Sequence, residues 1–295
     1  MRFERCLMSS DRKGVMKYNK FSVLMSVYYK ENPAFLDRAL RSILFDQTIK
    51  PNEVVIIKDG LLTKELNAII DKYEKRFPRI VKTKQLKENV GLGEALKIGI
   101  FECSNEIIAR MDSDDISLPR RFEKQLCCIN NLKVDIVGCN ILFFEENEND
   151  IYAKQIFPQN HDEIVKRSKY RSPIAHAGSM YKKSAILKSG NYSGKFKFFE
   201  DYYLWVRMIK NGFLFYNIQE FLYKVRAPRD YYERKSGYNY LKTEIKLYNY
   251  FLSSKHINFF EYVFYLSPRI IIRLLPKPVV RKIYNVFLRE NEKNR

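Results

Sequence analysis

Short apolar runs alternate with helical patterns through the first 112 residues, and this alternation constrains the fold more than any other feature. The runs are rich in β-branched and aromatic side chains and predict buried strands at 21–29, 53–60, 80–86 and 106–112. The segments between them carry apolar residues at helical spacing and predict helices at 33–47, 63–77 and 93–104. Such alternation is typical of an α/β fold whose mostly parallel sheet is covered by helices on both faces.

Two later segments extend this pattern. The run at 134–144 predicts a fifth strand, and the segment at 197–213 predicts a helix that stops at Gly212. Nearer the N-terminus, Asn32 and Pro33 have the residue types expected at the N-cap and first turn of the helix that follows the first strand.

Polar side chains stand where three of the predicted strands end. Tyr28, Asp59 and Asp112 each follow or close a buried run. Ligands of open parallel sheets bind beyond the C-terminal ends of the strands. We therefore expect these three side chains to converge on one edge of the sheet and to form a binding site there.

Three carboxylates fall within four positions in the segment MDSDD. Side chains along a strand point to the same face at every second residue, so Asp112 and Asp114 can enter the same cleft. Such hard oxygen ligands suit Mg²⁺ or Mn²⁺, which usually also take substrate phosphate oxygens. The structural alternative is that Asp115 or Ser117 caps a helix beginning near Pro119.

Two other segments allow a functional and a structural interpretation. In ENVGLGEALKIGI (88–100), two glycines open a helix, which either brings backbone N–H groups near a phosphate or forms a plain turn. In FEDYYLW (199–205), Glu200 and Asp201 either complement the helix dipole or supply a general base. His176 is either a hydrogen-bonded core histidine or a site residue.

The chain of 295 residues has a net charge of +19, from 53 Lys and Arg against 34 Asp and Glu. This balance favours a polyanionic partner: nucleic acid, an anionic membrane or a phosphorylated ligand. Residues 224–295 alone hold 16 basic and 6 acidic side chains, interleaved with Tyr and Phe. That composition suits single-stranded nucleic acid, a helix lying in a membrane interface, or an ordinary helix packed on the domain.

No segment reaches the roughly 20 apolar residues that span a bilayer. The nearest, 256–276, is interrupted by Glu261, Pro268, Arg269 and Arg273. The N-terminus lacks the apolar region of a secretory signal peptide. The odd number of cysteines indicates reduced thiols in a cytosolic protein. The five cysteines form no CxxC pair and the three histidines are scattered, so a zinc site is not expected.

Four segments, taken in order, resemble family 2 glycosyltransferases, most closely the branch that builds bacterial surface polysaccharides. They are FSVLMSVYYKENPAFLDRALRSILFDQTIKPNEVVIIKDG, NVGLGEALKIGI, IIARMDSDDISLPRRFEKQ and FEDYYLWVRMIKNG, within residues 20–226. The resemblance implies a GT-A fold, with a Rossmann-like nucleotide-binding sheet, and inverting transfer from a nucleotide-activated sugar. It also implies a glycan acceptor, often lipid-linked, at the cytoplasmic face of the membrane.

The resemblance implies roles for individual residues as well. Asp112 and Asp114 would form the DXD element, with Asp114 closest to a Mn²⁺ or Mg²⁺ ion. Asp201, or in second place Glu200, would be the catalytic base. The donor would lie against Ser26, Val27, Tyr28, Glu31, Asp59, Asn89, Gly91 and Asp112, with Asp59 at the nucleotide base.

The favoured donor nucleotide is UDP, which rests on its frequency in the family. After the second strand the family often has two acids and a Gly-Ser pair, whereas this chain reads Lys58-Asp59-Gly60-Leu61. Only Asp59 is therefore carried over from that motif, and the resemblance determines the nucleotide base less closely.

We expect three parts: an N-terminal extension at 1–19, a GT-A domain at 20–226 and a basic helical region at 227–295. The last part is expected to associate with the anionic inner face of the cell membrane. A nucleic-acid-binding protein would explain the positive charge but not the acidic segments. A sugar nucleotidyltransferase would need a Gly-rich basic loop after the first strand, where this chain reads YYKENP. The intact acids argue against a non-catalytic homologue.

Overall fold

Four parallel strands form one half of a nine-stranded sheet in the computed structural model, which describes residues 19–228 and 237–275. β2 pairs with β3 and with β1, and β1 pairs with β4. The bounds are Phe21–Val27 for β1, Glu53–Lys58 for β2, Val81–Gln85 for β3 and Ile107–Met111 for β4. These four strands lie where the sequence predicts them.

The other half of the sheet is mixed, so the expected parallel arrangement gives way beyond β4. β8 is antiparallel to both β4 and β6, and β9 is parallel to β6. β5 is antiparallel to β9, and β7 is antiparallel to β6. The bounds are Ile116–Ser117 for β5, Ile136–Phe144 for β6, Ile151–Gln155 for β7, Met180–Lys182 for β8 and Phe215–Arg226 for β9. A short polar connection joins β6 to β7, which antiparallel pairing permits without a crossover helix.

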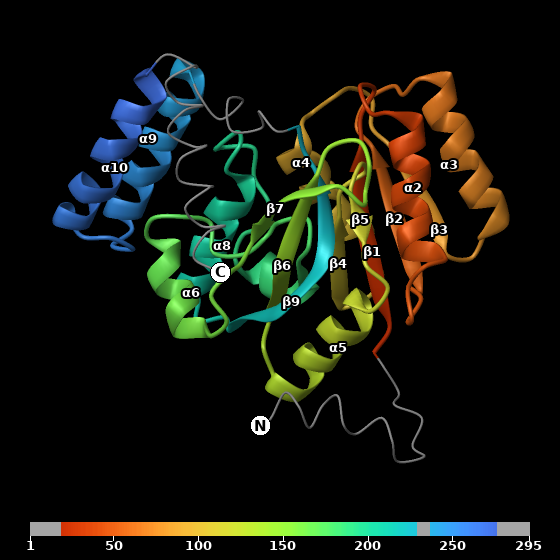
Figure 1. Cartoon of the computed structure of the whole chain (residues 1–295), viewed down its shortest axis with the longest axis horizontal. Helices are drawn as coiled ribbons and strands as arrows, with labels where there is room; N and C mark the ends of the chain where they lie inside the picture. Colours follow the sequence, from red (N-terminus) through yellow and green to blue (C-terminus); the bar gives the residue numbers. More distant parts are fainter. Residues whose placement is uncertain (1–18, 229–236, 276–295) are drawn as a thin grey trace.

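Helices cover both faces of the sheet (Figure 1). One face carries α2 (Pro33–Leu44), α3 (Lys64–Arg76) and α5 (Arg121–Leu132). The other carries α4 (Leu92–Glu102), α6 (His161–Ser168), α7 (Lys183–Lys188) and α8 (Glu200–Lys210). Successive residues of β1 serve the two layers in turn, because Val23 and Met25 enter the first core cluster and Leu24 the second.

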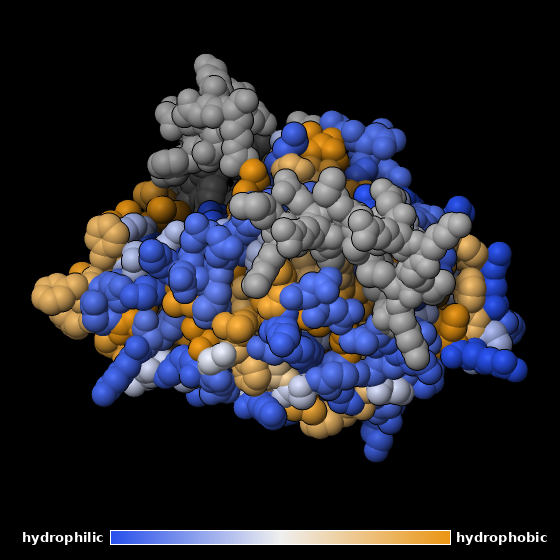
Figure 2. All heavy atoms as spheres, turned by 90° about the horizontal axis from the view of Figure 1, so that it is seen from below, coloured by the Kyte–Doolittle hydropathy of each residue, from blue (hydrophilic) through white to orange (hydrophobic). Residues whose placement is uncertain are grey.

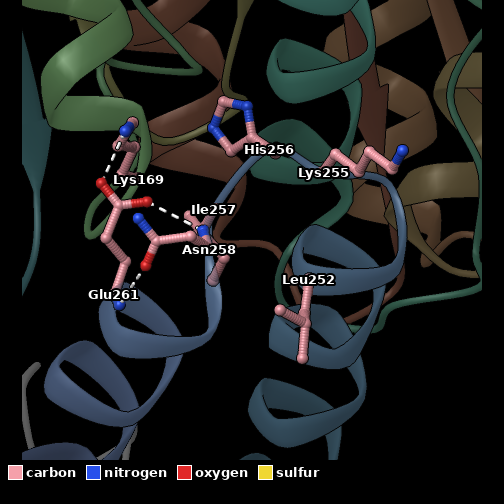
Figure 3. A pocket seen from close by; sticks show the side chains of 7 residues that line it. All are labelled: Lys169, Leu252, Lys255, His256, Ile257, Asn258 and Glu261. Atoms are coloured by element: carbon pink, nitrogen blue, oxygen red, sulfur yellow. Dashed lines mark hydrogen bonds and ion pairs between the residues drawn. The ribbon is translucent and has the colours of Figure 1, made fainter.

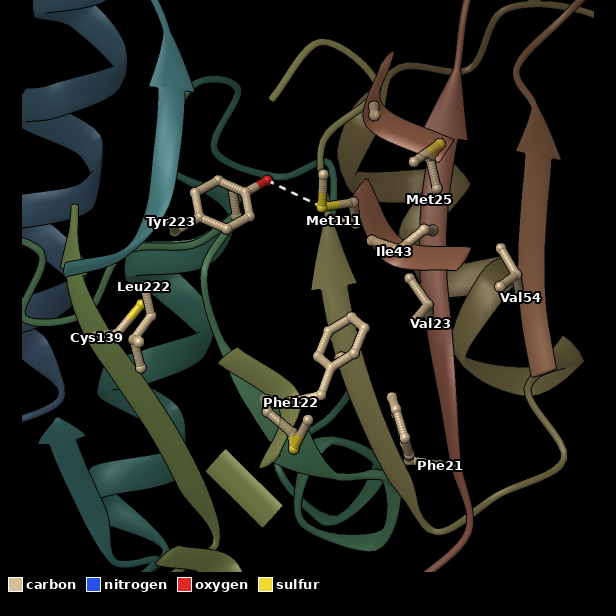
Figure 4. Packing of buried hydrophobic residues seen from close by; sticks show 14 of the residues in the cluster. Phe21, Val23, Met25, Ile43, Val54, Met111, Phe122, Cys139, Leu222 and Tyr223 are labelled. Carbon is tan, nitrogen blue, oxygen red and sulfur yellow. Dashed lines mark hydrogen bonds between the residues drawn. The ribbon is translucent and has the colours of Figure 1, made fainter. Parts of the chain in front are cut away.

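Large apolar side chains fill the first core cluster (Figure 4). Phe21 of β1 meets Phe122 of α5 edge to face, with ring centroids 5.0 Å apart. Val23, Met25 and Ile43 are fully buried in the same cluster. Parallel pairing holds β1 and β4 side by side above this cluster, and so fixes the edge at which their polar continuations emerge.

Local signals set the helix ends. The Asn32 side chain accepts a hydrogen bond from the Ala34 N–H at 2.9 Å, and α2 begins at Pro33, so both predictions are confirmed. α8 is shorter than the predicted 197–213 and ends just before Gly212, whose φ is +78°.

A helical hairpin of α9 (Tyr238–Ser253) and α10 (Phe259–Leu274) lies at one end of the molecule, beside α8 (Figure 1). Phe199 and Val206 pack against Leu247 and Phe251 of α9 in a third core cluster. The C-terminal helical extension is therefore confirmed for 238–274. The three domain boundaries stay predictions, and residues 1–18, 229–236 and 276–295 lie outside the described residues.

No helix in the described part of the chain combines the length and the low polarity that crossing a membrane requires.

Candidate active site

Contacts between distant segments join the polar residues that follow β1 and β4. The Ser113 hydroxyl donates a hydrogen bond to the Glu31 carboxylate, which ties the turn after β1 to the acidic segment after β4. Glu31 also accepts a hydrogen bond from the Asn32 N–H at 2.8 Å, at the start of α2. The two segments therefore lie side by side, as expected for segments that follow parallel strands at the same edge of the sheet.

Asp59 joins the end of β2 to the glycine-containing segment before α4. Its carboxylate accepts hydrogen bonds from the Val90 N–H at 2.8 Å, the Gly91 N–H at 3.1 Å and the Asn89 side-chain amide at 3.1 Å. Asp59 is only 3% exposed, while Asn89 stays exposed. Asp59 thus holds the 89–91 loop (residues 89–91) in place, and this loop is available at the surface beside it.

The loop leads into α4, and the first turn of α4 contacts the start of α8. A Cβ atom added to Gly93 would lie 2.7 Å from Cγ of Glu200, so glycine allows this close approach. Glu94 accepts a hydrogen bond from the Gly194 N–H at 2.9 Å. The segments 88–100 and 199–205 are therefore neighbours, although about 100 residues separate them.

The acidic segment itself is firmly held. Asp112 forms an ion pair with Arg110, and its N–H donates to the Tyr223 hydroxyl oxygen at 3.1 Å. Arg226 of β9 donates from its N–H to the Asp115 carboxylate at 2.7 Å and from Nε to the Asp114 carbonyl at 3.0 Å. β9 therefore shapes the acidic segment from the far half of the sheet.

The alternative in which Asp115 or Ser117 caps the next helix is wrong. Ser117 belongs to the short strand β5, which pairs with β9, and Asp115 binds the backbone of Arg226. α5 begins only at Arg121, and its N-cap residue makes no side-chain cap hydrogen bond. The intervening strand separates the carboxylates from the helix start.

Burial and mutual repulsion disfavour the ionised forms of two carboxylates in this segment. Burial, together with the charges of Asp112 and Glu31, raises the pKa of Asp114 to about 7. Burial and the neighbouring carboxylates also raise the pKa of Asp115 well above its usual range. A bound cation would relieve this repulsion, because it favours the charged form of each carboxylate.

Two carboxylates alone do not complete a metal site. Within residues 19–228 and 237–275, no group of three or more His, Cys, Asp or Glu side chains is arranged to hold a metal ion. Mg²⁺ is commonly bound by one or two carboxylates together with substrate phosphates and water. Asp112 and Asp114 fit a site of that kind, in which the substrate supplies the remaining oxygens.

A buried polar group lies behind the acidic segment. Arg110, in the middle of an entirely buried strand, is 1% exposed. Burial raises the pKa of Tyr192 well above its usual range. The charge of Arg110 acts to lower this pKa, and the charge of Asp201 acts to raise it. His176 lies 3.0 Å from the Tyr192 hydroxyl through Nε2, and burial lowers its pKa well below the usual range. His176 is thus a hydrogen-bonded, neutral part of this group.

The two acids at the start of α8 differ in their surroundings. Asp201 accepts a hydrogen bond from the Ser172 hydroxyl at 3.2 Å. Burial raises the pKa of Glu200, which also faces α4 through Gly93. Both lie in the first turn of α8, where the partial positive charge of the helix favours ionised carboxylates.

The residues at the end of β1 and directly after it differ in how open they are to a ligand. The Val27 side chain is fully buried in the core, and its carbonyl accepts the Asp59 N–H at 2.8 Å. Ser26 is partly buried, whereas Tyr28 is 42% exposed. Tyr28 is therefore the side chain among these three that is open to a ligand.

A hollow of about 410 Å³ lies elsewhere, at the turn between α9 and α10 (Figure 3). Its lining includes Lys169, Lys255, His256 and Glu261, and none of the predicted site residues. We therefore place the candidate active site on contacts at the sheet edge and not on this hollow.

Sequence reasoning missed several residues of the site. Arg110 carries a signal in hindsight, because it is the one charged side chain within the buried strand β4. Ser172, Tyr223 and Arg226 carry none, because each reaches the site from a segment far along the chain.

The comparison with protein families gives a match to the model of Glycosyl transferase family 2 over residues 22–190. The chain is 36% identical over 271 residues to an Escherichia coli protein named UDP-Gal:alpha-D-GlcNAc-diphosphoundecaprenol beta-1,3-galactosyltransferase, covering 92% of this chain and 97% of that protein. It is 33% identical over 265 residues to the amylovoran biosynthesis glycosyltransferase AmsE of Erwinia amylovora, covering 90% and 97%.

Two solved structures share the fold at lower identity. Staphylococcus aureus TarS 1–349, in complex with UDP-GlcNAc, has a TM-score of 0.59 at 18% identity, over 78% of this chain and 65% of that chain. This chain thus spans slightly less than two thirds of the TarS structure. The mannosyltransferase PcManGT from Pyrobaculum calidifontis, in complex with GDP-Man and Mn²⁺, has a TM-score of 0.57 at 13% identity, over 97% and 86%. The chain has the GT-A fold and belongs to glycosyl transferase family 2.

Proposed function

We propose that the protein is an inverting, metal-dependent glycosyltransferase that moves a sugar from a nucleotide-sugar, with UDP favoured, to a lipid-linked glycan in surface-polysaccharide synthesis. The observation that carries this proposal is the meeting of four separated motifs in one region. Glu31 contacts Ser113, and Asp59 holds the 89–91 loop. Gly93, in the first turn of α4, lies so close to Glu200 that an added Cβ would be 2.7 Å from its Cγ. A nucleic-acid-binding protein or a nucleotidyltransferase has no comparable support from these contacts or from the family match.

The donor would lie along the first three of these segments. Tyr28 offers an exposed ring beside the nucleotide, and the exposed Asn89 and the 89–91 loop border it. Asp59 keeps the loop in place through both of its carboxylate oxygens, and contact between Asp59 and the nucleotide base stays a prediction.

Asp112 and Asp114 would hold Mn²⁺ or Mg²⁺ together with the donor diphosphate. When bound, the cation would supply Lewis-acid stabilisation of the leaving diphosphate. Arg110, in its ion pair with Asp112, would hold that carboxylate in place at the strand end. Arg226 fixes the backbone of the same segment from the other side.

Asp201 would act as the general base. It takes the proton from the acceptor hydroxyl while that oxygen attacks the anomeric carbon from the face opposite the diphosphate. The bond from the anomeric carbon to the diphosphate oxygen breaks in the same step, so the configuration inverts once. The Ser172 hydroxyl orients the carboxylate, and Glu200 is the second candidate.

The names of the relatives suggest the acceptor. The Escherichia coli relative is named for transfer from UDP-Gal to a GlcNAc-diphosphoundecaprenol, and the Erwinia relative for amylovoran biosynthesis. Both align over at least 90% of this chain, so the acceptor-binding half lies within the alignment. We therefore propose a sugar linked to a polyprenyl diphosphate as acceptor, at the cytoplasmic face of the membrane.

The test is transfer of sugar to a defined acceptor. The purified chain is incubated with a panel of UDP-, GDP- and dTDP-sugars and with short-chain polyprenyl-diphosphate GlcNAc, and the product linkage is determined by NMR. We expect one donor to give a product whose anomeric configuration is opposite to that of the donor. Retention of configuration would overturn the inverting mechanism, and absence of product with every donor would overturn this acceptor class.

A further inference from the structure

Phe198 has a backbone conformation that is costly for a side chain of its size. Its φ is +74°, and a bulky residue in this left-handed region is a conformational outlier. In the described part of the chain, the other non-glycine residues with positive φ are Lys133, Asn191 and Lys255, and each follows the end of a helix. A left-handed residue is common at such a position, because it ends the helix. Phe198 instead precedes α8, so helix termination does not explain its conformation.

The Phe198 ring has one covered side and one open side. It stacks on Tyr240 of α9, with ring centroids 5.5 Å apart and an angle of 30° between the ring planes. Phe198 is nevertheless 51% exposed, whereas Tyr240 is 8% exposed. Tyr240 is itself held between Phe199, at 4.9 Å between ring centroids, and the Arg273 guanidinium, at 4.7 Å from its ring centroid. The Phe198 ring is therefore a supported, flat apolar surface that is open to a ligand on the side away from Tyr240.

Phe198 lies beside the acids that would carry out the proposed transfer. It stands three positions before Asp201, and three residues of chain span at most about 11 Å. Burial raises the pKa of Glu200, while a backbone hydrogen bond from Phe198 and the charge of Lys197 act to lower it. The exposed Lys197 ammonium lies 5.5 Å from the centroid of the Phe198 ring. A cation, an apolar ring and a carboxylate therefore follow one another within residues 197–201.

We propose that Phe198 positions the acceptor, a sugar carried on a diphosphate: the sugar packs on the open side of the Phe198 ring, and Lys197 pairs with the diphosphate. The face of a pyranose ring that carries C–H bonds is apolar, so it packs well on an aromatic ring. The order Lys197, Phe198, Asp201 then matches the order of phosphate, sugar ring and attacking hydroxyl. Strained residues persist where they serve a binding or catalytic site, which accounts for the positive φ of Phe198. The inference rests on the proposed function, which supplies the acceptor class.

Positive charge is spread widely over the chain, so the role of Lys197 needs a matched control. The net charge is +19, and hydrophilic side chains cover much of the face in Figure 2. Long-range attraction alone would draw a diphosphate toward many of these positions. Lys75, an exposed lysine of α3, measures that general attraction. Phe101, which is 62% exposed on α4, measures the effect of losing an exposed phenylalanine elsewhere.

The test is an NMR titration of the full chain with a short-chain alkyl diphosphate of GlcNAc and with the neutral alkyl glycoside of GlcNAc, each with and without UDP and Mn²⁺. The parent is compared with Phe198→Asn, Phe198→Tyr and Lys197→Gln, and with the controls Phe101→Asn and Lys75→Gln. Asparagine tolerates a positive φ, so Phe198→Asn should fold as the parent does. We expect affinity for the diphosphate probe to fall about tenfold or more in Phe198→Asn, and to be retained in Phe198→Tyr and both controls. Lys197→Gln should lower that affinity toward the affinity for the neutral glycoside.

The sugar protons report the contact itself. Protons above the face of an aromatic ring shift upfield, so the ring protons of the bound GlcNAc should shift upfield with the parent and Phe198→Tyr but not with Phe198→Asn. A parent that does not bind the diphosphate probe, or a Phe198→Asn variant with the affinity and shifts of the parent, would overturn the proposal. Binding that depends on Phe198, without transfer from any donor, would uphold this acceptor site and overturn the proposed transfer.

Discussion

Replacing Gly60 by alanine should disturb the donor site in a way that a matched glycine elsewhere does not. Gly60 has a φ of +84°, and a Cβ there would lie 2.8 Å from the backbone nitrogen of Asn89. Gly212 has a nearly equal φ of +78°, yet a Cβ there would meet nothing within 4 Å. In both variants an alanine must adopt a left-handed conformation, which costs about 1–2 kcal/mol of stability. Only Gly60→Ala also forces backbone atoms apart.

The added contact should cost Gly60→Ala roughly another 1–3 kcal/mol of unfolding free energy, as overpacking generally does. If the 89–91 loop moves to relieve it, nucleotide affinity should also fall by tenfold or more, about 1.4 kcal/mol. Urea unfolding and nucleotide titration on both variants measure the two quantities. Equal stability losses, with unchanged nucleotide affinity in Gly60→Ala, would refute the reasoning that this loop borders the donor.

Three further predictions follow from other contacts. Asp201→Asn should lower the transfer rate by about 10²–10⁴-fold, with Glu200→Gln affected much less, measured by steady-state kinetics; the reverse order would move the base to Glu200. Burial alone would raise the pKa of Glu53, but the hydrogen bonds to its carboxylate lower this pKa to about 2. The ionised carboxylate therefore stabilises the fold fully above pH 4.5, and this stabilisation is lost as the pH falls toward 2. Glu53→Gln should therefore flatten the acid limb of thermal stability, and an unchanged limb would contradict this. Glu244→Gln leaves Arg273 buried without its carboxylate and should cost about 3–5 kcal/mol, seen as a lower melting temperature; an unchanged melting temperature would show that the pair does not hold the hairpin.

Local periodicity was enough to predict the half of the sheet that β1 to β4 form. The alternation up to Asp112 predicted four parallel strands, because each buried strand is followed by a helix that must cover it. The same pattern could not predict β8, which inserts antiparallel between β4 and β6 from a segment about 70 residues downstream of β4. That pairing depends on long-range packing and has no local signal.

The acids of the candidate site were predictable for a related reason, since side chains after parallel strands share one edge. The residues that hold these acids in place could not be predicted. Arg226 binds Asp115 across 111 residues, and a sequence cannot reveal which distant backbone a carboxylate will accept from. The ion pairs of α10 were hidden in the same way, because Arg269 and Arg273 find their partner Glu244 on another helix.

The most direct test of the central claim is nucleotide release from the donor in the presence of the acceptor and Mn²⁺ or Mg²⁺. The parent is compared with Asp114→Asn and with Asp71→Asn, which removes an exposed carboxylate from α3 as a matched control. The account predicts release from one class of nucleotide-sugar, abolished by EDTA and by Asp114→Asn but retained in Asp71→Asn. Release that persists in EDTA and in Asp114→Asn would contradict the assignment of a cation site to the acidic segment.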